Sequence, residues 1–169
     1  MTALPDLIEA VTAFACRAGE KLRKQDHRAD QVLTFIHTSP FRKQDRQNLR
    51  SITVPLRRPS CDSAALTSTA VRSLRATFKP GFNYAKAGVM LLDLHSADIE
   101  QGELDLDEPG TDRTQLMEAL DSLNDRYGRN TVSIASGGVA GDKRRFSMER
   151  ERKTPEYTTR WEDMPVAHA

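Results

Sequence analysis

Apolar residues recur at helical spacing near the start of the chain. The stripe repeats every three or four residues and comprises Leu7, Val11, Phe14, Ala18 and Leu22. This spacing places apolar side chains on one face of a helix, and Pro5 suits the first turn, where its missing N–H is not needed. We therefore predict a helix from about Pro5 to Lys24, with the stripe facing the core.

Two strands are predicted next. Residues 31–38 are rich in β-branched and aromatic side chains, which favour a strand, and Ser39-Pro40 ends it. A second strand with alternating apolar residues runs from about Leu49 to Leu56. Because Pro55 cannot donate a ladder hydrogen bond, this strand should end early or lie at the edge of its sheet.

A second helix and a third strand complete this pattern. Asp62 or Ser63 can cap the helix, Pro80-Gly81 ends it, and its apolar stripe comprises Leu66, Ala70, Val71, Leu74 and Phe78. The apolar run from Ala85 to Leu94 is typical of a buried strand. The order helix, strand, strand, helix, strand is that of an α+β, βαββαβ unit without its first strand.

The C-terminal third predicts a small αββ module. Asp112 with Gln115 can form a capping box for a helix that ends at Tyr127-Gly128, and its inward positions are Leu116, Met117, Leu120 and Leu123. A hairpin of Thr131–Ala135 and Arg144–Met148 should follow. A lone tryptophan in an extended tail usually packs over its own domain, so we expect Trp161 to pack with Tyr157 and Met164.

Charge divides the chain into parts that its overall net charge of +1 conceals. Residues 1–95 carry 15 Lys and Arg against 8 Asp and Glu, a net charge of +7. Residues 96–121 carry 9 acidic residues against Arg113 alone, and residues 122–169 have a net charge of +2. A basic domain at 1–95, an acidic linker at 96–110 and a module at 111–169 suggest a nucleic-acid partner and a protein partner.

Other features narrow the class of protein. No run of 18 apolar residues exists, so no membrane span is expected, and the N-terminus lacks a signal-peptide pattern, which indicates a cytoplasmic protein. Cys16 and Cys61 are too isolated for a zinc site or a disulfide framework and are interpreted as structural. His37 has no partner at ligand spacing and is expected to be a surface residue at a strand end. No metal or cofactor is predicted.

Three stretches of the chain form a recognisable set: Ala18–Arg23 with Thr34–Phe41, Tyr84–Leu91, and Leu123–Arg129 with Pro155–Trp161. In order and with similar spacing, they together resemble the UmuC family, the catalytic subunits of bacterial DNA polymerase V in SOS mutagenesis and their plasmid-borne relatives. Any one stretch is weak evidence, but the combination covers nearly the whole chain. The resemblance implies that residues 4–95 are the little finger, a DNA-holding domain of Y-family polymerases, and that residues 111–165 are the UmuC C-terminal extension.

The resemblance also implies what this chain lacks. A Y-family enzyme needs palm carboxylates that hold two Mg²⁺ ions, and the palm, fingers and thumb of the family would lie upstream of Met1. We therefore expect no polymerase activity from the chain alone and assign no catalytic residues. In the family a strand precedes the first helix. In a ferredoxin-like sheet that strand is an inner one, so its absence would expose an inner edge.

The DNA-holding role is expected to fall on seven basic residues of the N-terminal domain. Phosphate contacts need cations spread over a surface and give strongly salt-dependent affinity without sequence preference. The candidates are Arg42, Lys43, Arg46, Arg50, Arg57, Arg58 and Lys86. The alternative is that these side chains form a solvated surface with no ligand.

The acidic linker occupies the place where UmuC-like proteins carry a peptide that binds the sliding clamp, typically Gln-Leu-x-Leu-Phe. Leu104 and Leu106 keep two apolar anchors, but Glu103 replaces the glutamine and Asp107 replaces the aromatic residue. Losing an aromatic anchor costs on the order of 2–4 kcal/mol, so we expect a weakened or lost motif. The alternative is an acidic tether with no binding role.

The resulting hypothesis is the non-catalytic C-terminal part of a UmuC-like translesion polymerase that holds DNA without sequence preference. Two rivals remain open. One is a stand-alone protein-interaction module that binds a UmuD′-like accessory protein, the RecA filament or the sliding clamp. The other is a decayed gene fragment with no activity.

Overall fold

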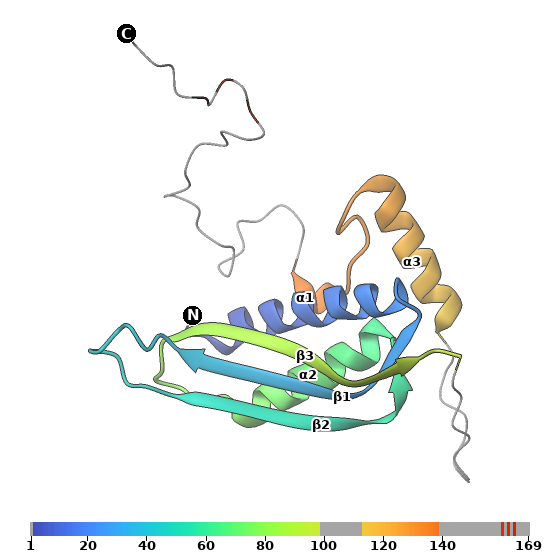
Figure 1. The fold of residues 1–169 in the computed structure, drawn as a ribbon. Coiled ribbons are helices and arrows are strands. Elements are labelled where there is room, and N and C mark those ends of the chain that lie inside the picture. Colours follow the sequence, from blue (N-terminus) through green and yellow to red (C-terminus); the bar gives the residue numbers. More distant parts are fainter. Residues whose placement is uncertain (1, 99–112, 139–159, 161, 163, 165–169) are drawn as a thin grey trace.

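The computed structural model describes residues 2–98, 113–138, 160, 162 and 164. Figure 1 shows the order of the elements: α1 (Leu4–Arg23), β1 (His27–Thr38), β2 (Leu49–Ser60), α2 (Ser63–Thr77), β3 (Tyr84–Ser96), α3 (Thr114–Tyr127) and the 3₁₀ turn η1 (Ala135–Gly137). The α+β class and the sequence of the first five elements were correctly predicted. The strands are longer than predicted, because β1 begins at His27 and β2 continues to Ser60.

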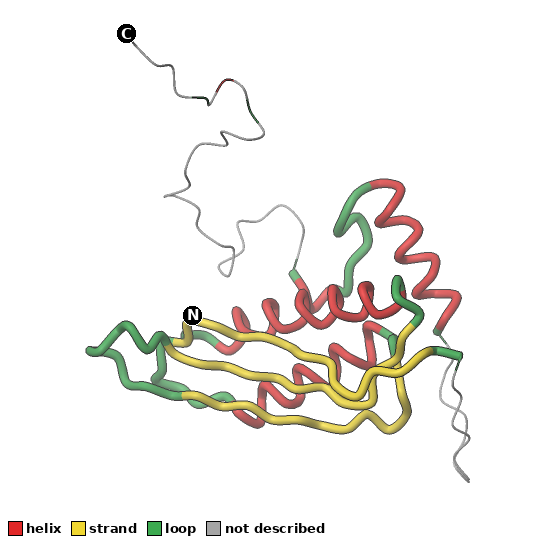
Figure 2. Tube along the Cα trace, in the orientation of Figure 1, coloured by secondary structure: helices red, strands yellow, loops and turns green. Residues whose placement is uncertain are grey.

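The strands form one antiparallel sheet in the order β2-β1-β3. Helices α1 and α2 lie together on one face of it (Figure 2), with α1 mainly against β3 and α2 against β1 and β2. Among the described strands β2 pairs with β1 alone, so the missing N–H of Pro55 interrupts no second ladder there. Of the two alternatives given for this strand, the position at the sheet edge is confirmed. The early end is wrong, because β2 continues past Pro55 to Ser60.

The core lies between the two helices and the sheet. Its fully buried members include Leu7 and Val11 of α1, Leu66 and Leu74 of α2, and Ile36 of β1. Asp62 begins α2 as predicted, since its carboxylate accepts a hydrogen bond from the backbone N–H of Ala64 at 2.8 Å. The two helices thus bury the apolar faces that their 3.6-residue period predicts.

Two residues of the predicted α1 stripe, Phe14 and Ala18, lie outside the buried core. Phe14 is 39% exposed, and the buried face instead continues through Ala15 and Gly19. Gly19 marks a close approach of α1 to α2, because a Cβ placed there would lie 3.0 Å from the Ser63 hydroxyl and 3.2 Å from Leu66 Cδ1. Residue 15 and residue 14 are both compatible with the helix face that carries residues 7 and 11. The contact of α1 with α2 therefore decided which of the two is buried.

The sheet corrects two expectations about the strands. β1 has a neighbour on both sides along its length, so no gap remains for an inner strand. The run from Ala85 to Leu94 is not a buried strand either. Within the described residues β3 lies at the sheet edge, where Met90 is 52% exposed.

The C-terminal region is only partly as predicted. Helix α3 ends at Tyr127 before Gly128, but Arg113 occupies its N-cap without a side-chain hydrogen bond, and Asp112 lies outside the described residues. Met117 is buried, whereas Leu116 is 58% exposed and Leu123 is also exposed.

The expected strand at Thr131–Ala135 is absent. The Asn124 side chain instead accepts from Val132 N at 3.0 Å and donates to Val132 O at 2.9 Å, which satisfies this backbone without a strand partner. The second expected strand, with Tyr157 and Trp161, lies outside the described residues, and Met164 is exposed.

Candidate nucleic-acid interface

All seven predicted DNA contacts are exposed, but they form two groups. In the antiparallel register His37 lies opposite both Leu49 and Lys86, so the end of β1 and the starts of β2 and β3 meet at one end of the sheet. This end carries the loop 39–48, and its cations are Arg42, Lys43, Arg46, Arg50 and Lys86. Arg57 and Arg58 lie seven or eight residues further along β2, roughly 25 Å away at ~3.3 Å per residue. Figure 1 shows the loop projecting from the sheet.

The loop 39–48 is held in one shape by neutral side chains. The Thr38 hydroxyl donates to Gln47 Oε1 at 2.7 Å. Gln47 Nε2 donates in turn to the carbonyl oxygens of Arg42 and Asp45, both at 3.0 Å. Gln47 therefore bridges the two ends of the loop and holds the backbone at Arg42 and Asp45.

Tyr84 ties this loop to the start of β3. Its ring is buried, and its hydroxyl accepts from Asn48 Nδ2 at 2.8 Å and donates to the carbonyl oxygen of Lys79 at 3.1 Å. A second tie joins Asn83 Nδ2 to the Asp45 carboxylate at 3.1 Å. Because side chains ordered before binding lose less conformational entropy when they bind, this bracing favours ligand binding at the loop. The basic composition of the loop gave no signal for these bracing residues.

Individual loop cations differ in how they are held. The Arg46 guanidinium lies 5.2 Å from the centre of the Phe82 ring, a cation–π contact that orders the side chain without neutralising it. Arg42 lies 3.9 Å from the Asp45 carboxylate, an exposed pair at the limit of ion-pair distance. Such pairs are weak, so the positive field of the loop is retained.

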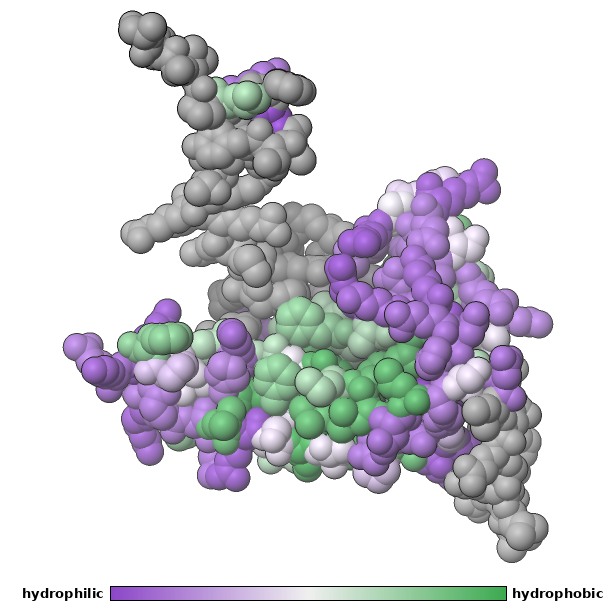
Figure 3. All heavy atoms as spheres, viewed as in Figure 1, coloured by the Kyte–Doolittle hydropathy of each residue, from purple (hydrophilic) through white to green (hydrophobic). Residues whose placement is uncertain are grey.

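The face of the sheet opposite the helices is partly apolar. Leu33, Phe35 and His37 alternate with the buried residues of β1 and so point away from α1 and α2. Phe35 covers Gly88 of β3, where a Cβ would clash with its ring, and stacks near His37 with centroids 6.3 Å apart. Figure 3 shows apolar residues over the middle of the molecule and mainly polar ones over the loop end, where Phe41 is nevertheless 91% exposed. This end therefore joins a flat apolar surface to a cluster of cations, an arrangement suited to a polyanion with apolar parts.

The predicted clamp peptide lies outside the described residues, with all four of its positions, Glu103, Leu104, Leu106 and Asp107. Among residues 2–98 and 113–138, no three His, Cys, Asp or Glu side chains are grouped so as to hold a metal ion. No helix in the described part of the chain has both the length and the apolar character needed to cross a membrane.

Comparison with known proteins identifies the family. Residues 1–106 match the profile of the impB/mucB/samB family C-terminal domain, more than half of the chain. The chain belongs to the impB/mucB/samB family. Residues 114–167 match a second profile, described as a domain of unknown function (DUF4113).

Relatives in this family are similar over almost the whole chain. Protein UmuC of Salmonella typhimurium strain LT2 is 36% identical over 165 residues, which are 97% of this chain and 38% of UmuC. Protein MucB of Escherichia coli is 35% identical over 97% of this chain, and Protein ImpB of Salmonella typhimurium is 37% identical over 94%. The chain spans less than two fifths of the length of these relatives. The predicted resemblance to UmuC is confirmed.

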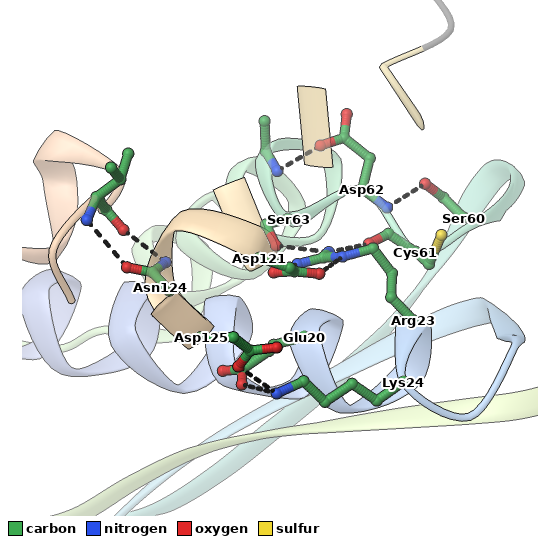
Figure 4. A network of polar contacts seen from close by, with 12 residues as sticks. Glu20, Arg23, Lys24, Ser60, Cys61, Asp62, Ser63, Asp121, Asn124 and Asp125 are labelled. Atoms are coloured by element: carbon green, nitrogen blue, oxygen red, sulfur yellow. Dashed lines mark hydrogen bonds and ion pairs between the residues drawn. The ribbon is translucent and has the colours of Figure 1, made fainter. Parts of the chain in front are cut away.

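The two family regions are joined by an ion pair that the sequence interpretation missed. Arg23 of α1 makes a bidentate contact with Asp121 of α3, with Nε–Oδ2 at 2.6 Å and Nη2–Oδ1 at 2.8 Å (Figure 4). Its Nη1 also donates to the Cys61 carbonyl at 2.7 Å and to the Ser63 hydroxyl at 3.0 Å. The side chains of Arg23 and Asp121 are only 11% and 15% exposed. Arg23 therefore holds α1, α2 and α3 together.

Electrostatics reinforces this junction. Burial opposes the charge of Arg23, but the hydrogen bond and negative charge of Asp121 outweigh it, so the pKa of Arg23 is raised above its ordinary value. Lys24 contacts Asp125 at 2.9 Å and Glu20 at 3.1 Å, and these contacts raise its pKa as well. Cations at the C-terminal end of a helix suit its dipole. Two of them at the end of α1, Arg23 and Lys24, also bind acidic residues of α3.

A cavity of about 210 Å³ lies beside this junction, between α1, α3 and the segment 129–137. Its lining includes Phe14, Cys16, Arg129 and Val132. Burial raises the pKa of the Cys16 thiol, whose sulfur lies 3.6 Å from the Thr67 hydroxyl. Both cysteines are half-buried and free, in agreement with a structural role.

Proposed function

We propose that this chain is the DNA-holding C-terminal part of a UmuC-like translesion polymerase. The single observation that carries the proposal is the braced loop end, where five exposed cations surround the ends of three strands. Membership of the impB/mucB/samB family supports it, since UmuC and MucB are relatives over the same region. In this proposal residues 1–95 bind DNA, and residues 111–169 form the C-terminal module. Residues 96–110 are the acidic linker that joins these two parts.

The geometry favours phosphate contacts over reading of bases. The loop cations and the pair Arg57 and Arg58 lie roughly 25 Å apart along β2. This is about twice the ~12 Å width of the major groove, so the two groups would contact phosphates at separate places along a duplex. No helix projects from the open face of the sheet among the described elements, so the contacts we propose are with the backbone. Backbone contacts position DNA but do not select its sequence, which suits an enzyme that must hold damaged templates.

The polymerase chemistry itself is assigned to the part of the relatives that this chain does not span. The palm carboxylates and their two Mg²⁺ ions would belong there, and this chain would contribute duplex binding to SOS mutagenesis. We propose no polymerase activity for the chain alone. We also propose that it acts on DNA in the cytoplasm.

Fluorescence anisotropy with a labelled primer–template tests the proposal. If about five phosphates are neutralised, affinity should fall roughly 10²–10³-fold between 50 and 200 mM salt. The double variant Arg42→Ala with Arg46→Ala should lower affinity and reduce the salt slope by about two contacts. Its matched control is Arg72→Ala with Arg75→Ala, which removes the same charge from the exposed face of α2.

Two results would contradict the proposal. One is the absence of binding at low salt by a chain that unfolds cooperatively. The other is an equal loss of affinity in the α2 control, which would show that net charge alone attracts DNA. Scrambling the sequence of the primer–template should change nothing.

A further inference from the structure

Phe41 stands at the apex of a tight turn in the loop 39–48. The backbone N–H of Arg42 donates to the Ser39 carbonyl oxygen at 3.2 Å, which closes a hydrogen-bonded β-turn. Pro40 occupies the second position of this turn, where its fixed φ is favoured. Phe41 is third and has no positive φ, as a type I turn requires. The turn therefore holds the backbone of Phe41 in a defined conformation.

The Phe41 ring is not part of the core. The residue is 91% exposed, the largest fraction among the exposed large apolar residues of the described chain. Phe78 and Phe82 differ from it, because both pack against the core. Single exposed apolar residues are common on protein surfaces, so the neighbours of Phe41 decide what its ring can bind.

Those neighbours are mainly cationic. Arg42 and Lys43 follow Phe41 directly in the chain, and both are exposed. Arg46 comes next and is held 5.2 Å from the centre of the Phe82 ring. Proteins bind single-stranded nucleic acid with this combination, because bases stack on an aromatic ring while cations contact the phosphates.

The rest of the loop keeps this combination in place. Its one acidic residue, Asp45, accepts from Asn83 Nδ2 at 3.1 Å and lies 3.9 Å from Arg42. Gln47 Nε2 holds the Arg42 carbonyl oxygen at 3.0 Å, directly after Phe41. A loop that is ordered before it binds loses less conformational entropy on binding.

We infer that Phe41 stacks on an unpaired base, so that the loop favours DNA at a gap or another place where bases are unstacked. The inference rests on the proposed DNA binding at the same loop and adds a preference to it. Bases within an intact duplex have both faces covered by their neighbours, whereas an unpaired base can offer a face to the ring. Every base has such a face, so this contact selects the state of the DNA and not its sequence.

Fluorescence anisotropy with the full chain tests the inference on two DNAs, a duplex with a short central gap and the same duplex with the gap filled. Wild type should bind the gapped DNA more tightly. Phe41→Ala should lower affinity for the gapped DNA about 5- to 100-fold, the range expected for one stacked base. Its affinity for the filled duplex and its salt slope should not change, because no phosphate contact is removed.

Two further comparisons identify stacking as the cause. A gap of abasic nucleotides keeps the phosphates and removes the bases, so wild type should lose its preference there. Phe41→Leu keeps an apolar side chain without a ring and should behave like Phe41→Ala, whereas Phe41→Tyr should retain wild-type affinity. The control is Leu49→Ala, since Leu49 is 75% exposed at the same end of the sheet and should not affect the preference. Circular dichroism and thermal unfolding check that each variant is folded.

The outcomes separate this inference from the proposed function. Salt-dependent binding without a preference for the gap, or with a preference that Phe41→Ala does not reduce, overturns the inference alone. So does an equal loss of affinity for both DNAs, or wild-type affinity in Phe41→Leu. Vesicles of phosphatidylglycerol provide the other arm, since binding to them that requires Phe41 while DNA affinity does not would assign the ring to a lipid surface. Absence of binding to either DNA overturns both proposals.

Discussion

Breaking the Arg23–Asp121 pair should release α3 while leaving the sheet folded. Asp121→Asn removes the charge that holds Arg23 and leaves a guanidinium in a site where it is only 11% exposed. Loss of one partner from a fully buried pair costs about 3–5 kcal/mol. Because this pair keeps some solvent contact and Arg23 retains its bonds to Cys61 and Ser63, we expect about 2 kcal/mol.

A double-mutant cycle isolates this interaction. The cycle of Arg23→Ala and Asp121→Asn in urea unfolding should give a coupling energy of about 1.5–3 kcal/mol. Hydrogen exchange followed by mass spectrometry should show faster exchange in residues 114–127 and little change in β1. The exposed pair of Lys24 and Asp125 supplies the comparison, since its cycle should give a weaker coupling of about 0.2–1 kcal/mol.

The pH dependence follows from the raised pKa of Arg23. A cation whose pKa is higher in the folded state stabilises the fold at every pH below its unfolded pKa and loses this effect only as pH rises through the folded value. The Arg23 contribution should therefore be constant from pH 6 to 9. A coupling near zero, or unchanged exchange in α3 when the pair is broken, would refute the role assigned to Arg23.

Four further outcomes are expected. Gln47→Ala should weaken binding of the primer–template about three- to tenfold without changing its salt slope, because it loosens the loop but removes no charge, whereas Gln44→Ala in the same loop should have no effect. Gly88→Ala should destabilise the fold by about 1–3 kcal/mol in urea unfolding, because the new Cβ displaces the Phe35 ring. In a Cys61→Ser background, Cys16 should react with iodoacetamide only at higher pH than a model thiol, since burial raises its pKa and the thiolate is the reactive form; an equal pH profile would contradict this. Asp107→Phe with Glu103→Gln should create measurable binding to a bacterial sliding clamp in surface plasmon resonance, and no gain would indicate that the linker is only a tether.

Local signals predicted the elements of the N-terminal domain well. Asp62 as a cap, the stop at Pro80-Gly81 and the β-branched run at 31–38 act within a few residues, so they are readable without the fold. The strand ends were less predictable. β1 extends back to His27 because β3 offers Ser96 as a pairing partner, and such a partner is invisible in a local window.

Long-range contacts explain the errors. Thr131–Ala135 has strand-like composition, but the Asn124 side chain takes the place of a pairing strand. Phe14 fits the helical stripe, yet the close contact of Gly19 with α2 rotates the buried face away from it. In both cases a contact between distant residues outweighed a modest local preference.

The candidate DNA site shows the same division. Seven cations were identifiable by type and position alone, because charge is a property of each residue. Their separation into two groups, and the bracing of the loop by Gln47 and Tyr84, depend on the register that brings His37 beside both Leu49 and Lys86.

Sequence alone was sufficient to predict the helices, the approximate strands within residues 1–95, the basic character of that region and the family. Each of these depends on residue types at short spacing or on similarity along the chain. The tertiary structure alone decided that β1 is central and that Arg23 binds Asp121 across 98 residues. These features depend on which surfaces meet, and packing and strand pairing select those surfaces only when the whole chain has folded.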